Sequence, residues 1–101
     1  MEDKHTVIGK TIVIKGELEG DEDLIIEGRV EGSIKLNKNL TIMETGVLEA
    51  DVQTQNTEIS GRINGNITVN DKIEITESGR MIGDIKAPRL VIKDGAKFRG
   101  N

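Results

Sequence analysis

The side chains that could perform chemistry in this chain are few, and their spacing predicts no catalytic centre. His5 is the only histidine among the 101 residues. A Ser-His-Asp arrangement or a histidine-based metal site would depend on it, yet it lies in a short polar segment at the start of the sequence. The serines that could act as nucleophiles are Ser33, Ser60 and Ser78. We therefore expect no catalytic residue, no cofactor and no metal ion, and we interpret the protein as one that is not an enzyme.

Two short strings resemble ligand-binding motifs without completing them. Gly9, Lys10 and Thr11 match the end of a phosphate-binding P-loop, but that motif also needs a glycine five residues before Gly9, where this chain has Lys4. The acidic run Asp21–Asp23 could attract a divalent cation, but the glycine-rich aspartate repeat of calcium-binding β-rolls is absent. We favour a turn for the first string and a solvated acidic corner for the second.

Charged residues recur at similar intervals and are predicted to form outward rows. Glu31 and Glu49 could act as paired carboxylates, but on an open convex surface nothing would desolvate them as acid catalysis requires. A basic row suits either a binding stripe for cell-wall-associated partners or lipid headgroups, or an ordinary salt-bridged surface. Its members are Arg29, Arg62, Arg80 and Lys97. We favour the salt-bridged surface because acidic residues interleave with the row, and each exposed pair contributes only ~0.2–1 kcal/mol.

The elements that carry these residues follow a pattern that alternates and then resets. From Leu24 to Val52, aliphatic residues occupy alternate positions, as in strands with one buried face. The pattern restarts after about sixteen or seventeen residues, as in stacked repeats. The aliphatic residues are mostly Ile and Val, alanine occurs three times, and twelve glycines and one proline punctuate the chain. This composition indicates an all-β protein.

Stacking the repeats places aliphatic residues in ladders that would form one narrow core. The first ladder is Ile14, Val30, Leu48, Ile63, Met81 and Phe98; the second is Leu18, Ile34, Val52, Ile67 and Ile85. The third is Leu24, Leu40, Thr57, Ile73 and Leu90, followed two residues later by Ile26, Ile42, Ile59, Ile75 and Ile92. Small residues lie between the first two ladders: Gly16, Gly32, Ala50, Gly65, Gly83 and Gly100.

The pattern predicts a single-domain parallel β-helix over residues 7–101, after a flexible lead-in over residues 1–6. About six rungs of 16–17 residues, at ~4.8 Å each, give a rod ~25–30 Å long.

The handedness of this β-helix is predicted from general rules. Crossovers between parallel strands are right-handed in about 98% of cases. The left-handed β-helices that form an exception are built on hexapeptides, whereas this chain alternates by two. We therefore expect a right-handed solenoid.

The overall charge and hydropathy exclude several classes of partner. The formal net charge is −4, so nucleic acid is not an expected partner. Cysteine is absent, which excludes a disulfide framework and fits a reducing compartment. No apolar run approaches the roughly 18 residues of a membrane span, and the start of the sequence has no signal-peptide segment. We expect a soluble cytoplasmic protein.

Both ends of such a solenoid would expose a strand edge and core side chains, which template further pairing. At the C-terminal end these are Leu90, Ile92 and Phe98, and at the N-terminal end Ile8, Ile12, Ile14 and Leu18. We predict that both sets are polymerisation interfaces, so that the chief partner is another copy of the chain in an end-to-end homopolymer. For Phe98 the alternative is a plug that closes its own core.

Three strings resemble the core repeats of the bactofilin family: IGKTIVIKGELEGDEDLIIEGRVEGSI over residues 8–34, ISGRINGNI over residues 59–67 and LVIKDGAKFRG over residues 90–100. The resemblance covers nearly the whole chain, including the order of an irregular first turn, an EGRVEG turn and a closing DGAxFxG turn. It implies a right-handed β-helix of triangular cross-section. It also implies a bacterial cytoskeletal scaffold that polymerises without nucleotide into nonpolar filaments, with like ends meeting.

The tails of that family affect the expected location and partners. Many members carry an N-terminal tail with a short hydrophobic and basic membrane-targeting segment, whereas residues 1–6 are short and charged. We therefore expect the chain to be a core domain, with no membrane attachment of its own. The inner face of the cytoplasmic membrane is the alternative location. Cell-wall-related or polar proteins are the further partners that the resemblance implies, through tails that this sequence lacks.

Two other functions of β-helices remain alternatives. An acyltransferase or nucleotidyltransferase domain predicts hexapeptide spacing and a histidine on a coil, and the sequence offers neither. Ice binding needs a flat ladder of threonines on one face. The candidate threonines for such a face are Thr41, Thr54, Thr57, Thr68 and Thr76, and their spacing does not align them from rung to rung. A non-enzymatic scaffold is the function that we predict.

Overall fold

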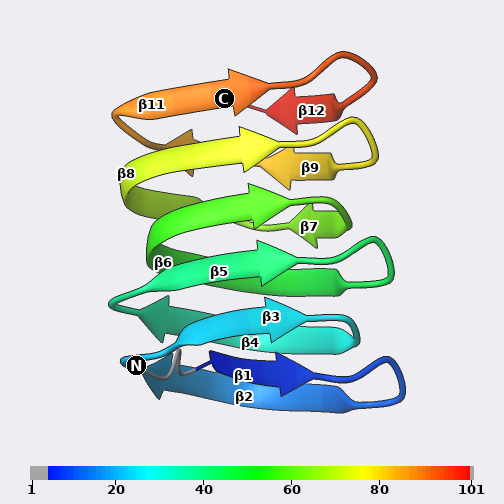
Figure 1. Cartoon of the computed structure of the whole chain (residues 1–101), viewed down its shortest axis with the longest axis vertical. Helices are drawn as coiled ribbons and strands as arrows, with labels where there is room; N and C mark the ends of the chain where they lie inside the picture. The colour runs from blue at the N-terminus through cyan, green and yellow to red at the C-terminus, as the bar shows by residue number, and fades with distance from the viewer. Residues whose placement is uncertain (1–4, 101) are drawn as a thin grey trace.

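The computed structural model describes residues 5–100 and shows one coil of strands in which each turn stacks on the one before (Figure 1). A single 12-stranded sheet contains every strand. In chain order the strands are β1 (His5–Ile8), β2 (Val13–Gly20), β3 (Asp23–Ile26), β4 (Arg29–Leu36), β5 (Asn39–Ile42), β6 (Val47–Ile59), β7 (Arg62–Asn64), β8 (Ile67–Ile75), β9 (Arg80–Gly83), β10 (Ile85–Lys86), β11 (Arg89–Ile92) and β12 (Lys97–Gly100). The expected all-β parallel solenoid of about six turns is confirmed. Its handedness and triangular cross-section remain predictions.

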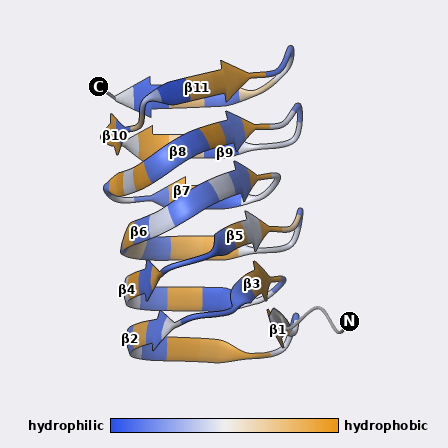
Figure 2. Cartoon of the chain, turned by 60° about the vertical axis from the view of Figure 1, so that its left-hand side comes forward, coloured by the Kyte–Doolittle hydropathy of each residue, from blue (hydrophilic) through white to orange (hydrophobic). Residues whose placement is uncertain are grey.

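All strand pairs are parallel, and their register reproduces the predicted ladders. Ile14 pairs with Val30, Val30 with Leu48, and Ile63 with Met81. The ladder that contains Leu24 and Leu40 is likewise aligned residue by residue. The longest dimension of the molecule is 31 Å, close to the expected length. The inward residues form one continuous core of Ile, Leu, Val and Met side chains. Hydrophobic and hydrophilic residues succeed one another along the strands (Figure 2), and most residues between the core positions are exposed or partly exposed.

The length of a turn varies more than the expected 16–17 residues. The register advances by 15 residues from Leu48 to Ile63 and by 18 from Ile63 to Met81. The difference lies in the corner loops, which are longer before Gly46 and Gly79 than before Gly28 and Gly61. In the longer loops a backbone bond closes the turn, as in Gly46 N–H to the carbonyl of Met43 at 2.8 Å. The first strand begins at His5, so it takes in two residues assigned to the lead-in, and residues 1–4 lie outside the described part.

Asparagine and aspartate side chains join successive turns at one corner. The Asp23 carboxylate accepts the backbone N–H of Asn39 at 3.0 Å, and the Asn56 side chain donates to Asn39 at 2.9 Å. The side-chain oxygen of Asn56 in turn accepts the N–H of Lys72 at 3.1 Å. These bonds satisfy backbone groups where the strands change direction, and so they stabilise the corner.

The core contains one polar pair, made by Thr54 and Thr57. Both side chains are buried, and their hydroxyl oxygens lie 2.6 Å apart. Thr54 also donates to the carbonyl of Asn56 at 3.2 Å, at an irregularity in the pairing of β6 with β8. Thr57 therefore depends on Thr54 for its side-chain hydrogen bond, whereas Thr54 also bonds the Asn56 carbonyl.

We expect Thr54→Val and Thr57→Val to be coupled. Thr54→Val leaves the Thr57 hydroxyl buried without its partner, at a cost of ~1–3 kcal/mol. The double variant removes both hydroxyls and should lose less stability than the sum of the single changes, by about 1 kcal/mol. Urea unfolding followed by circular dichroism measures the cycle. Strict additivity would show that the two hydroxyls do not depend on each other.

Candidate functional site

The C-terminal end of the solenoid exposes residues at core positions that the preceding turn buries. Leu90 and Ile92 are each 45% exposed, whereas Ile73 and Ile75, which pair with them, are 0% exposed. Phe98 is partly buried and lies in register with the buried Met81. β11 pairs only with β8 and β12 only with β9. Within residues 5–100, the outer edges of both strands therefore have no partner.

The N-terminal end presents a hollow that opens into the core. Its volume is about 310 Å³, and its apolar lining includes Ile8, Ile14, Leu18, Leu24 and Leu36. Ile14 and Leu18 are only partly buried, although their counterparts one turn later are fully buried. Ile8 is 4% exposed and belongs to the core, so it offers little surface for a contact. Acidic residues rim the hollow: Glu19, Asp21, Glu22 and Asp23.

Ile12 occupies a corner that other turns reserve for a small residue. Its N–H bonds to the carbonyl of Gly9 at 3.0 Å, the same turn that Gly46 makes with Met43. At Gly46 an added Cβ would lie 2.5 Å from the carbonyl oxygen of Ile26, on the preceding turn. Ile12 belongs to the first described turn, so no earlier carbonyl opposes its side chain, which is 46% exposed. By this register the side chain projects from the N-terminal end.

The two ends differ in charge. Residues 5–27 contain two basic and six acidic side chains, whereas residues 80–100 contain six basic and two acidic ones. The apolar residues at the N-terminal end are therefore surrounded by carboxylates, and those at the C-terminal end by cations. This asymmetry is visible in the sequence, although the net charge of −4 does not reveal it.

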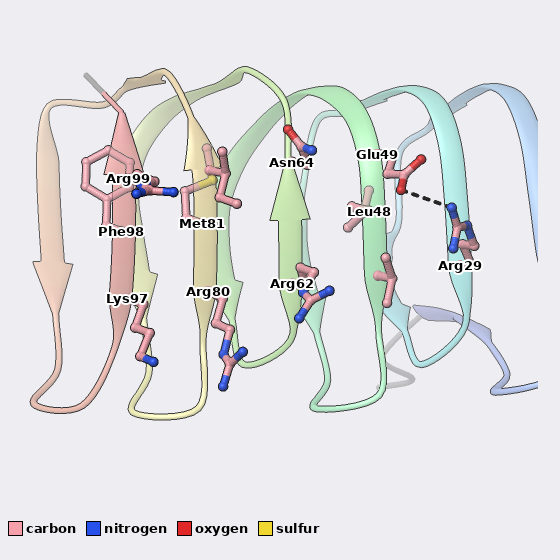
Figure 3. Close-up of a pocket in the computed structure, with 12 residues that line it drawn as sticks. Arg29, Leu48, Glu49, Arg62, Asn64, Arg80, Met81, Lys97, Phe98 and Arg99 are labelled. Atoms are coloured by element: carbon pink, nitrogen blue, oxygen red, sulfur yellow. Dashed lines mark hydrogen bonds and ion pairs between the residues drawn. The ribbon is translucent and has the colours of Figure 1, made fainter.

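The basic row is salt-bridged at one end only. Arg29 bonds Glu49 at 3.0 Å (Figure 3). It also lies 3.4 Å from Glu31, so this arginine pairs with both candidate carboxylates. The ion pairs among residues 5–100 do not include the other three members of the row, Arg62, Arg80 and Lys97. The expected salt-bridged surface is correct for Arg29 and wrong for the rest. The cause is the outward row beside them, which holds Asn64, Ile82 and Arg99 in place of acids.

The other candidate residues have structural contacts. Asp21 accepts a hydrogen bond from Asn37 on the next turn, and Ser78 donates to the carbonyl of Ser60 at 2.9 Å. Gly9 to Thr11 form the turn between β1 and β2. Within the described part of the chain, no group of three or more His, Cys, Asp or Glu residues is placed to hold a metal ion. The side chain of His5 lies outside the description.

The threonines do not form a ladder. In strand register Thr41 lies beside Ile25 and Glu58, Thr57 beside Leu40 and Ile73, and Thr68 beside Gln53 and Lys86. No threonine of the described strands pairs with another, so the flat face needed for ice binding is not formed there. No helix between residues 5 and 100 has the length and apolar character required to cross a membrane.

Comparison with known proteins agrees with the earlier resemblance. A family model described as bactofilin, polymer-forming cytoskeletal, matches residues 6–101. Three curated proteins of Myxococcus xanthus are similar to this chain. Bactofilin BacO is 56% identical over 97 residues, which cover 96% of this chain and 77% of BacO. Bactofilin BacN is 63% identical over 95 residues (94% and 84%), and Bactofilin BacP is 49% identical over 96 residues (95% and 40%). No solved structure gives a significant match.

Proposed function

The chain belongs to the bactofilin family of polymer-forming cytoskeletal proteins, and on this premise we propose that it assembles end to end into filaments without nucleotide. A cytoskeletal polymer, rather than an enzyme, is the function of this family. The surfaces that meet in this assembly are the two ends of the solenoid. The C-terminal end presents Leu90, Ile92 and Phe98, and the N-terminal end presents Ile12, Ile14 and Leu18. Ile8 lies behind the N-terminal surface, in the core.

The observation that carries the proposal is the change in exposure at the last turn. Leu90 and Ile92 are nearly half exposed, whereas Ile73 and Ile75, their partners on the preceding turn, are fully buried. Covering the exposed half of each would contribute about 1 kcal/mol, since full burial of such a side chain contributes ~1.5–3 kcal/mol. Strand pairing across the end contact would also satisfy the free N–H and C=O groups of β11 and β12.

We further propose that such filaments act as a scaffold in a bacterial cytoplasm and localise other proteins, with roles in cell shape, cell wall or polarity. The described surface supports this indirectly. It offers long, repetitive outward rows on which partners can bind at regular intervals, and no assembled catalytic group is seen among residues 5–100.

Sedimentation of the purified chain tests the assembly. In buffer without nucleotide, we expect most of the protein to pellet at high speed above a critical concentration, and ATP or GTP should not change that concentration. The reason is that the contact buries apolar edges and contains no phosphate-binding loop. Protein that stays monomeric at high concentration would contradict the proposal, and so would assembly that required a nucleotide.

A further inference from the structure

One outward face of the solenoid changes its charge from one end to the other. This face is formed by β4, the start of β6, β7, β9 and β12. Near its N-terminal end Arg29 is neutralised by acids. Over the last three turns, four exposed cations occur, and none of them is in an ion pair within residues 5–100. These four residues, here called the basic patch, are Arg62, Arg80, Lys97 and Arg99.

The basic patch surrounds a hollow. Figure 3 shows Arg62, Arg80 and Lys97 on three successive strands, each extending from the same side. The hollow has a volume of about 650 Å³ and is lined by the four cations, by the ion-paired Arg29 and Glu49, and by apolar residues that include Leu48, Met81 and Phe98. Ile82 lies among the cations and is 46% exposed. A protein with a net charge of −4 thus concentrates unpaired positive charge around an apolar centre, which suits an acidic partner surface.

A surface of opposite charge lies on a neighbouring face of the solenoid. In two of the early turns, exposed carboxylates lie on the strand just after the small residue, which is Gly16 or Ala50. They are Glu17 and Glu19 on β2 and Asp51 on β6, here called the acidic patch. They line a second hollow of about 470 Å³. Lys35 is the only cation that lines it, and Asp51 makes a hydrogen bond with Asn66 at 3.4 Å but no ion pair among the described residues.

We propose that the basic patch of one copy binds the acidic patch of a second copy, and that this contact joins filaments side by side. The two surfaces match in sign, and each is hollowed and extends over about half of the solenoid. The basic patch occupies the last three turns and the acidic patch the first three. Neighbouring copies therefore lie antiparallel or displaced along their axes. This inference rests on the proposed end-to-end assembly.

The contact joins two different surfaces, so it does not close on itself as a symmetric dimer. Each copy offers a basic patch to one neighbour and an acidic patch to another. Contacts of this kind extend into open assemblies, which predicts bundles or sheets of filaments rather than pairs. Because the charges are exposed, the contact should weaken as salt screens them.

Charge reversal at the patches tests the contact. We would compare the parent with Arg62→Glu/Arg80→Glu and with a matched control, Lys10→Glu/Lys38→Glu. The control reverses two exposed lysines that line neither hollow. Negative-stain images show filaments and bundles, and low-speed pelleting measures the bundled fraction. At ~0.1 M KCl we expect the patch variant to form filaments with a bundled fraction at least about fivefold lower, and the control to bundle like the parent. At ~1 M KCl, where the Debye length falls to ~3 Å, the parent filaments should separate.

A rescue variant distinguishes a second copy from any other acidic partner. Adding Glu17→Lys/Asp51→Lys to the patch variant restores opposite charges, so bundling should return. Bundling unchanged in the patch variant, or not recovered in the rescue variant, would overturn the proposal. Persistent bundling with lost binding to phosphatidylglycerol vesicles or DNA would assign the basic patch to those anions instead.

A parent without filaments would refute the end-to-end function. In that case the lateral contact predicts that the parent self-associates in sedimentation equilibrium and that salt weakens this self-association. A parent that does not self-associate would overturn the lateral contact as well.

Discussion

Replacing Phe98 with arginine is expected to abolish filaments while leaving the solenoid folded. Phe98 lies on the last turn and is only partly buried, so an arginine there can extend its guanidinium into water in the isolated chain. In an end contact the same charge would be buried beside the exposed Leu90 and Ile92 side chains, at a cost of several kcal/mol. We expect the critical concentration for pelleting to rise at least about a hundredfold, since 1.4 kcal/mol corresponds to a factor of ten.

Two control variants make the Phe98 result specific. Phe98→Leu keeps an apolar side chain and should still form filaments. Met43→Arg introduces the same charge at an exposed hydrophobic residue in a lateral turn, and it should also leave assembly intact. Circular dichroism checks the fold of each variant. If Phe98→Arg assembled normally, the end contact would lie elsewhere. If it unfolded the chain, the residue would be a plug of its own core, the alternative that the sequence left open.

The second large effect concerns stability, and it is expected for Gly32→Ala. Gly32 has a φ of 130°, a conformation that residues with a Cβ rarely adopt. An added Cβ would lie 1.9 Å from the carbonyl oxygen of Gly16 on the preceding turn. Because that oxygen belongs to the backbone of a packed strand, it cannot move without disturbing the ladder. We expect the free energy of unfolding to fall by about 3 kcal/mol or more, and the midpoint of thermal unfolding to fall by at least about 12 °C.

Ala50→Gly is the matched control for Gly32→Ala, because it makes the reverse change at the same position of the next turn. Ala50 lies in register with Gly32, but the described residues with positive φ are all glycines. Ala50 therefore accommodates its methyl group through a different backbone conformation, not through spare room. The change to glycine removes one buried methyl group and should cost about 1 kcal/mol. If thermal unfolding showed a similar loss of stability in both variants, the clash and the positive φ at Gly32 would not be the cause of its intolerance to a Cβ.

The fold was predictable from the sequence because the side-chain periodicity reports directly on which face is buried. The ladder through Leu48 and Ile63 is an example, because alternation fixes the inward positions and the repeat fixes the register. The lengths of individual turns were less predictable, because corner loops vary without moving the core residues. The buried hydroxyl pair of Thr54 and Thr57 was also missed. Its polar side chains occupy inward positions that elsewhere hold aliphatic residues.

The candidate ends were predicted from where the repeats begin and end, but their details were not. Ile8 shares its ladder position with Ile92, yet it is buried while Ile92 is exposed. The sequence pattern treats both as end residues. Ion pairs depend on side-chain conformation across turns, so the pairing of Arg29 and the unpaired state of Arg80 were not evident. The recurrence of Asp23, Asn39 and Asn56 at one corner was visible in the sequence and could have predicted that ladder.

The most direct test of end-to-end assembly is the axial rise per subunit in filaments of the purified chain, measured by cryo-electron microscopy without nucleotide. The solenoid is 31 Å along its longest dimension. Adding one strand spacing of ~4.8 Å at the junction gives an expected rise of about 36 Å, with Phe98 at a junction between subunits. A rise near the shorter dimensions of 28 or 23 Å would mean that the subunits stack side on. Either that result or compact particles without filaments would contradict the proposed assembly.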